Sequence, residues 1–335
     1  MYTTTMLNKY LNPKTDFSFK KIFGTTKNQD ILIAMLNAVL ANQLHRPIKS
    51  VVFLTTFQDP EVAKKKQSIV DVLCQDSDGC QYIIEMQVPD AEGFQERAQY
   101  YAAKAFISQL AAGKNYLHLK KVIFLAFVDF TLFPQKTAYK SEHMTLDSKS
   151  LAHDLDKMSF TFVELPKFSK TNTTPIEELS LEEKFYYFLH HAPEMEEAAV
   201  QTLVGKDAII GKAFQALNRF FCTEAELQRY EAEEKRDRDH RAILAKANHQ
   251  GKEKGLQQGL QKGRKEGLQK GRKEGEQVGL QRGLQKGRKE GEQVGLEKGR
   301  WAEKLALARK LMAKGMDQHM IQELTGLSLS EFAGL

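Results

Sequence analysis

Two acidic residues are spaced so that they can hold a metal ion together. Asp71 and Glu85 lie in the stretch SIVDVLCQDSDGCQYIIEMQV, residues 68–88. A three-residue turn at 77–79, ending in glycine, would join two strands into a hairpin in which Asp71 lies directly opposite Glu85. The β-carbons of residues opposed in this way are about 4.5–5.5 Å apart, so two like charges repel. A divalent cation such as Mg²⁺ removes that repulsion, and it favours carboxylate oxygens.

The side chains around the pair bear on whether it is a metal site or an ordinary surface hairpin. An Asp and a Glu in a hairpin are usually solvated, and a two-residue turn would place Asp71 opposite Met86 instead. With the three-residue turn, Gln87 projects from the same face as Glu85, where its amide can orient a nucleophilic water. An acidic pair among apolar strand residues is costly without a partner. We expect the carboxylate face to include Ile69, Leu73 and Ile83, and the opposite face to carry Val70, Val72, Tyr82, Ile84 and Met86.

Helical and strand patterns alternate around this hairpin, as in a mixed α/β domain. The helical segments have apolar residues at three- and four-residue spacing, and the strand segments are short and rich in β-branched and aromatic residues. We expect helices at 17–23, 31–44 and 92–112, the last ended by Gly113, and strands at 51–57, 68–75, 80–88, 121–130 and 159–165. The order is helix, three strands, helix, strand. From 175 to about 234 the pattern is helical, and Ser180 begins a capping box.

Glycine occupies every fourth position from Gly251 to Gly299, thirteen times in a row. QKGRKEGEQVGL occurs at 269–280 and again at 285–296, so this is a true internal repeat. Each glycine costs an isolated helix about 1 kcal/mol relative to alanine. The segment is therefore either a helix that needs packing partners or a flexible basic tether. We favour a long, marginal helix that oligomerises.

The composition excludes several classes of protein. Three cysteines are too few for a disulfide framework and lack the spacing of a zinc site, which fits a cytoplasmic protein. The longest clean apolar run, 122–128, is far shorter than the roughly 20 residues of a membrane-spanning helix. We therefore expect no membrane partner. No GxxxxGK[ST] loop is present, so we expect no nucleotide cofactor either. The net charge is +6, and residues 251–300 hold 14 Lys and Arg against seven Glu, so the basic character belongs to the repeat.

Four runs of sequence resemble the Rpn recombination-promoting nucleases, a family of transposases in the PD-(D/E)XK nuclease superfamily. They are DFSFKKIFG at 16–24, IVDV at 69–72, IEMQ at 84–87 and RAQYYAAKAF at 97–106. The resemblance implies an α/β fold with a restriction-endonuclease-like αβββαβ core, which agrees with the order of elements above. We expect a nuclease-like domain at 8–170, a helical extension at 175–235, the basic repeat at 236–300 and a small helix-turn-helix-like module at 301–335.

The resemblance also implies roles for single residues. Asp71 and Glu85 match the motif carboxylates, which would hold Mg²⁺, or another divalent cation such as Mn²⁺ or Ca²⁺, with the backbone carbonyl of Met86. Asp16 matches the acidic residue of the first helix. Gln87 stands where the wider superfamily has Lys, so the metal or a nearby Lys must supply the positive charge that Gln lacks. Val70 likewise replaces the motif Pro, which is a milder departure.

Basic and aromatic side chains near the motif are candidates for the DNA backbone. Lys20 follows Asp16 by four residues, which suits either a phosphate contact or an ordinary surface ion pair. The other candidates are Arg97, Tyr101 and Lys104 along one side of a helix, and Lys66 before the motif strand.

The implied function is that of a DNA endonuclease that uses a metal ion to hydrolyse phosphodiester bonds. Its expected role is to promote recombination or to serve a mobile element. We expect the protein to be a homo-oligomer. The alternative is a catalytically inactive nuclease-fold protein that binds DNA and oligomerises, because a basic repeat attracts phosphate without reading sequence.

Overall fold

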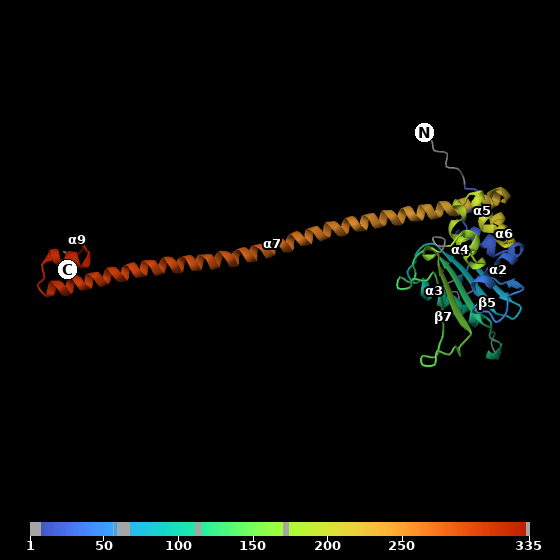
Figure 1. The fold of residues 1–335 in the computed structure, drawn as a ribbon, viewed down its shortest axis with the longest axis horizontal. Helices are drawn as coiled ribbons and strands as arrows, with labels where there is room; N and C mark the ends of the chain where they lie inside the picture. The colour runs from blue at the N-terminus through green and yellow to red at the C-terminus, as the bar shows by residue number, and fades with distance from the viewer. Residues whose placement is uncertain (1–7, 56, 59–67, 111–114, 170–173, 333–335) are drawn as a thin grey trace, which may run out of the picture. The chain divides into compact units, whose positions relative to one another are not determined.

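A computed structural model describes residues 8–55, 57–58, 68–110, 115–169 and 174–332. The chain divides into an N-terminal unit, up to residue 241, and a C-terminal unit from residue 242. One helix, α7 (Glu224–Ala313), runs through the boundary (Figure 1). None of the helices in the described ranges combines the length and apolar character needed to cross a membrane.

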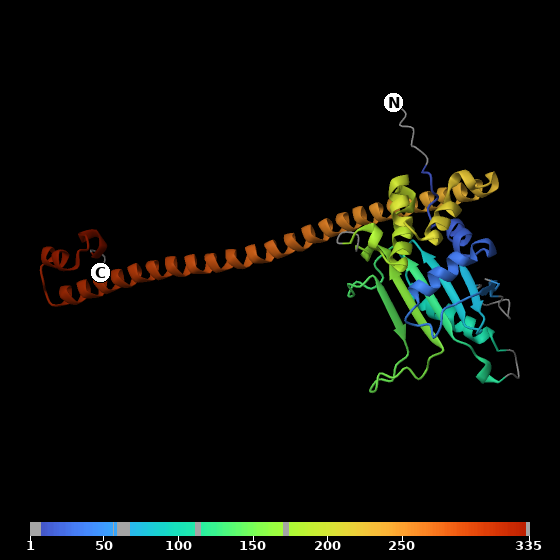
Figure 2. The same cartoon turned by 45° about the vertical axis from the view of Figure 1, so that its right-hand side comes forward.

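The N-terminal unit is built on a twisted sheet, visible in Figures 1 and 2. The sheet has six strands in the order β1-β4-β5-β6-β8-β7. Its strands are β1 (Val51–Phe53), β4 (Val72–Asp76), β5 (Gln81–Gln87), β6 (Val122–Val128), β7 (Lys140–Met144) and β8 (Met158–Glu164). β5, β6 and β8 are parallel to one another, and the other neighbours are antiparallel. β2 (Phe57–Gln58) and β3 (Ser68–Ile69) pair with each other in a separate two-stranded sheet.

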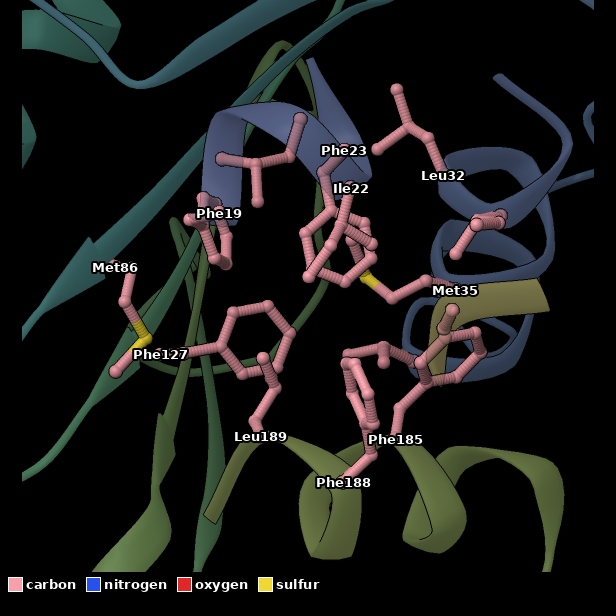
Figure 3. Packing of buried hydrophobic residues seen from close by; sticks show 14 of the residues in the cluster. Phe19, Ile22, Phe23, Leu32, Met35, Met86, Phe127, Phe185, Phe188 and Leu189 are labelled. Atoms are coloured by element: carbon pink, nitrogen blue, oxygen red, sulfur yellow. The ribbon is translucent and has the colours of Figure 1, made fainter. Parts of the chain in front are cut away.

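Helices cover both faces of the large sheet. One face carries α1 (Asp16–Phe23), α2 (Gln29–Val39), α4 (Leu181–His191), α5 (Glu197–Val204) and α6 (Ala208–Leu217), and the other carries α3 (Phe94–Ser108). Figure 3 shows the first layer, in which Phe19 of α1, Phe127 of β6, and Phe185 and Phe188 of α4 belong to one buried cluster. The ring centroids of Phe19 and Phe127 are 6.3 Å apart. This packing holds α1 against the ends of the central strands.

Within the six-stranded sheet, the order of helix, three strands, helix and strand is confirmed, with β1, β4 and β5 as the three strands. β6 is buried along its whole length, as its continuous apolar run predicts, and the capping box at Ser180 is present at the start of α4. Two helices end earlier than expected: α2 at Val39 rather than residue 44, and α3 at Ser108. The expected stop at Gly113 lies outside the described residues.

Strand β7 is absent from the sequence-based expectation. Its sequence, KSEHM, has no run or alternation of apolar residues because it lies at the edge of the sheet, where only Ser141 is buried. Its pairing with β8 comes from the tertiary arrangement. A short polar edge strand carries little signal in its own residues.

The predicted strand 68–75 is wrong as a single element. It is divided at residues 70–71 into β3 and β4, which belong to different sheets. The prediction for Val70 fails for the same reason. A bend at Asp71 places Val70 among the residues under α3, with Leu73, whereas Val72 packs on the opposite face. The strict alternation of a strand therefore stops just before the motif Asp.

The glycine repeat lies within α7, a helix of 90 residues. All thirteen repeat glycines are exposed, and a β-carbon built on any of them meets no atom within 4 Å beyond the helix's own backbone. The C-terminal unit also contains α8 (Gln318–Thr325) and α9 (Leu329–Phe332). Asp317 caps α8 by accepting the His319 N–H, and Ala308, Ile321 and Leu327 form a small buried core.

Candidate active site

The two motif carboxylates lie side by side across the β4–β5 hairpin. Val72 pairs with Ile84 and Leu73 with Ile83, which is the register of the three-residue turn. Gly79 ends that turn at φ +87°, in the left-handed region that favours glycine. The shorter turn that would place Asp71 opposite Met86 is thereby excluded.

Each carboxylate accepts a hydrogen bond from the backbone of the other chain segment. The Met86 N–H donates to Asp71 Oδ2 at 2.9 Å, and the Asp71 N–H donates to Glu85 Oε1 at 3.3 Å. These two bonds tie the segment after β3 to the end of β5. They hold both side chains at one corner of the sheet, beside the bend at Asp71.

Burial makes ionisation of this pair costly. Glu85 is 6% exposed. Its pKa is raised to about 8, first by loss of solvent and then by the negative charge of Asp71. Burial also raises the pKa of Asp71 to about 6, although the Met86 N–H and the Lys20 cation both favour its charged form. Two acidic groups this close repel each other when both are ionised, and a cation bound between them removes that repulsion.

Helix α1 brings Asp16 and Lys20 to the same corner. Thr15 caps the helix by accepting the Ser18 N–H, so Asp16 is the first helical residue. The Lys20 amine lies 2.5 Å from Asp16 Oδ1 and 3.8 Å from Asp71 Oδ1. The ion pair between residues four positions apart is therefore present, and the same amine also lies near the motif carboxylate of Asp71. A contact of Lys20 with phosphate stays a prediction.

Helix α3 brings Arg97 to Gln87. The Arg97 guanidinium donates to the side-chain oxygen of Gln87, whose amide nitrogen donates to the Pro89 carbonyl at 3.1 Å. The guanidinium also lies over the Phe94 ring, 4.9 Å from its centroid. The Nε of Arg97 is buried without a hydrogen-bond partner among the described residues. Arg97 therefore places a cation beside Gln87, where the wider superfamily has Lys.

The remaining predicted residues lie at different distances from the pair. Tyr101 is close enough for the charges of Arg97, Glu85 and Asp71 to affect its pKa, which burial raises. Lys104 is half-buried one turn further along α3. Lys66 lies outside the described residues, as do the two lysines before it.

Two groups at this corner escape sequence reasoning. Glu233, in the first turns of α7, accepts the N–H groups of Asp16 and Phe17 at 2.6 and 2.9 Å. Asp129 follows β6 directly, donates its N–H to the Gln87 carbonyl at 2.9 Å, and pairs with Lys14 at 2.7 Å. The position of Asp129 at the end of a buried parallel strand is a signal that would have found it. No local signal marks Glu233.

The donors present fit a hard divalent cation. Within the described ranges, no group of three or more His, Cys, Asp and Glu side chains could hold a metal ion. Mg²⁺, however, keeps several waters and needs only one or two carboxylates. Asp71 and Glu85 supply one half-buried and one buried carboxylate, both of raised pKa. Two such ligands suit an ion whose other ligands are water and phosphate.

Two protein families match the chain. The first, described as PD-(D/E)XK nuclease family transposase, matches residues 13–247. The second, described as the C-terminal HTH domain of the Rpn/YhgA-like nuclease family, matches residues 302–335. The first match spans the whole site described above, from α1 to Glu233. No curated protein and no solved structure matches the chain.

Proposed function

Since the chain belongs to the PD-(D/E)XK nuclease family of transposases, we propose that it is a metal-dependent DNA endonuclease that promotes recombination or serves a mobile element. The observation that carries the proposal is the Asp71–Glu85 pair, in which each carboxylate accepts an N–H from the opposite segment. The matched helix-turn-helix family and the basic repeat both support DNA as the substrate.

Asp71 and Glu85 would hold the ion with the carbonyl of Met86, and Asp16 would reach it through water. The ion, when bound, polarises the scissile phosphate and lowers the pKa of a bound water. Gln87 would orient the attacking water, because Arg97 and the Pro89 carbonyl fix its amide in one direction. Lys20 and Arg97 would stabilise the negative charge that develops on the phosphate, which is the task that Gln87 cannot perform.

The test is cleavage of plasmid DNA in Mg²⁺, Mn²⁺ or Ca²⁺. Asp71→Ala and Glu85→Ala should abolish cutting while DNA affinity is retained. Asp78→Asn is the matched control: Asp78 lies in the same hairpin and pairs with Arg46 far from the motif, so this variant should cut normally. Metal-independent cutting, or full activity in Asp71→Ala, would contradict the proposal.

A second candidate follows from Gln87 in the place of Lys. A nuclease fold without the catalytic cation could serve as a DNA-binding and oligomerising protein. Equal DNA binding by the unchanged protein and Asp71→Ala, with no cutting in any of the three metals, would favour this candidate.

A further inference from the structure

The start of α7 is fastened to α1 on one helical face. Glu226, Tyr230 and Glu233 are spaced four and three residues apart, so their side chains lie along the same side of the helix. Glu226 pairs with Lys21 of α1 at 2.8 Å. The Tyr230 hydroxyl is the acceptor for the Asn12 N–H at 3.1 Å, and Tyr230 is 3% exposed. Glu233 contacts Asp16 itself, which is one of the candidate active-site residues.

Glu233 occupies the N–H groups at the beginning of α1. The first N–H groups of a helix have no partner within it, and together they attract negative charge. Glu233 accepts the first two, from Asp16 and Phe17, with its two carboxylate oxygens, and Thr15 accepts the third, from Ser18. The first turn of α1 is therefore completed by a side chain from 217 residues further along the chain.

This arrangement determines what Asp16 can do. An acidic side chain in the first turn of a helix can bind the free N–H groups of that same turn. In α1 those groups are already bound by Glu233. The carboxylate of Asp16 is instead paired with Lys20, which in turn lies 3.8 Å from Asp71. The charge of Asp16 also acts on Asp71 itself.

We propose that Glu233 is a positioning residue: it fixes the first turn of α1 and thereby directs Asp16 and Lys20 toward Asp71. The inference rests on the proposed function in one respect, that Asp71 belongs to a metal site. It adds a contribution from α7, the helix that continues into the basic repeat, to the geometry of the candidate active site.

Amide hydrogen exchange on the full chain tests the proposal without any need for catalysis. Exchange at the start of α1, residues 16–18, should be fastest in Glu233→Ala, intermediate in Glu233→Gln and slowest in the unchanged protein, because Gln can accept only one of the two N–H groups. Glu231→Gln is the matched control. Glu231 lies on the same helix and the substitution removes the same charge, but the ion pair of Glu231 is with Arg219, which is outside α1.

Binding of Mg²⁺ by calorimetry, without DNA, provides the second readout. In Glu233→Ala the dissociation constant for Mg²⁺ should rise about tenfold or more, which is typical when a residue that orients metal ligands is removed. Glu231→Gln should leave it unchanged. A melting temperature close to that of the unchanged protein shows that Glu233→Gln is folded, so this variant remains informative if Glu233→Ala is not.

The two failures can be told apart. Unchanged exchange at residues 16–18 in Glu233→Ala and Glu233→Gln overturns the proposal, whatever the metal does. Faster exchange with an unchanged dissociation constant for Mg²⁺ also overturns it, because α1 would then be ordered by Glu233 without consequence for the site. Absence of Mg²⁺ binding in the unchanged protein instead counts against the proposed function, and the exchange rates then decide whether Glu233 holds α1.

Discussion

At the scale of single residues, the most unusual property of the protein is a pair of carboxylic acids that are hard to ionise. Glu85 and Asp71 have pKa values raised to about 8 and about 6 in the folded chain, mainly by burial. In the unfolded chain both groups return to ordinary values near 4. The folded state therefore binds protons more tightly than the unfolded state does, and this difference makes the free energy of unfolding depend on pH.

The metal-free protein should accordingly lose stability as the pH rises. The loss begins above the unfolded pKa values and continues to about pH 8, where Glu85 is ionised in the folded chain. Urea unfolding in EDTA between pH 5 and pH 8 should show a decline that is larger in the unchanged protein than in Glu85→Gln. We expect the difference to exceed about 1.4 kcal/mol, the free energy of one pKa unit. Parallel pH profiles for the two proteins would contradict this expectation.

Arg97 should contribute to the chemical step rather than to DNA affinity. Arg97→Met keeps much of the packing on Phe94 but removes the bond to Gln87 and the positive charge. We expect kcat for DNA cleavage to fall about 100-fold, the usual loss when one preorganised donor is removed from a developing charge. Lys104→Met, two turns further along α3, should instead raise KM with little effect on kcat. The same change in KM for both variants would assign Arg97 to the DNA backbone.

At the scale of elements, the repeat glycines are the feature least explained by packing within one chain. A β-carbon at Gly267 or Gly271 would meet no atom within 4 Å outside the helix's own backbone. Each glycine still lowers helix stability by about 1 kcal/mol relative to alanine. At the described glycines of α7, no contact with another part of the chain compensates for this loss of helix stability.

Alanine at Gly267 and Gly271 should therefore strengthen α7. We expect the loss of helical circular dichroism on heating to move to higher temperature, because each of the two substitutions stabilises the helix by about 1 kcal/mol. The same measurement at several protein concentrations checks for association. Earlier melting, or weaker association, in the double variant would indicate that the glycines form a surface for another chain.

At the scale of the whole molecule, positive charge and the candidate active site lie in different parts of the sequence. Residues 251–300 hold 14 Lys and Arg against seven Glu, and the site is built from residues up to 233. Phosphate contacts made by Lys and Arg release counterions, so they appear as a steep dependence of DNA affinity on salt.

Deletion of residues 251–300 should weaken DNA binding and flatten that dependence. We expect the slope of log affinity against log salt to fall by several units, since each lost phosphate contact removes about one. The deletion should also change the elution volume if the repeat oligomerises. Near-ultraviolet circular dichroism of the remaining chain checks that the N-terminal unit is still folded.

A variant with Lys286, Arg288 and Lys289 replaced by Gln keeps the length of the repeat and separates charge from length. An unchanged salt slope in both proteins would assign DNA binding to another part of the chain.

The sequence by itself determined the local arrangement of the site. The turn ending in Gly79 and the alternating residues of β4 and β5 predicted the pairing of Asp71 with Glu85 as one of two registers, because register depends on turn length and on which face is apolar, and the structure has that register. The order of the helices and of most strands in the large sheet also followed from hydrophobic period, whereas the polar edge strand β7 did not. Turn length and hydrophobic period are properties of residues close together in the chain, so the sequence alone reveals them.

Only the tertiary structure decided which distant groups complete the site. The bond from Arg97 to Gln87 and the capping of α1 by Glu233 depend on how α3 and α7 lie against the strands and α1. The face taken by Val70 depends on a bend that separates two sheets. Periodicity shows which side of an element is apolar, but it does not show which other element covers that side or which polar group arrives with it.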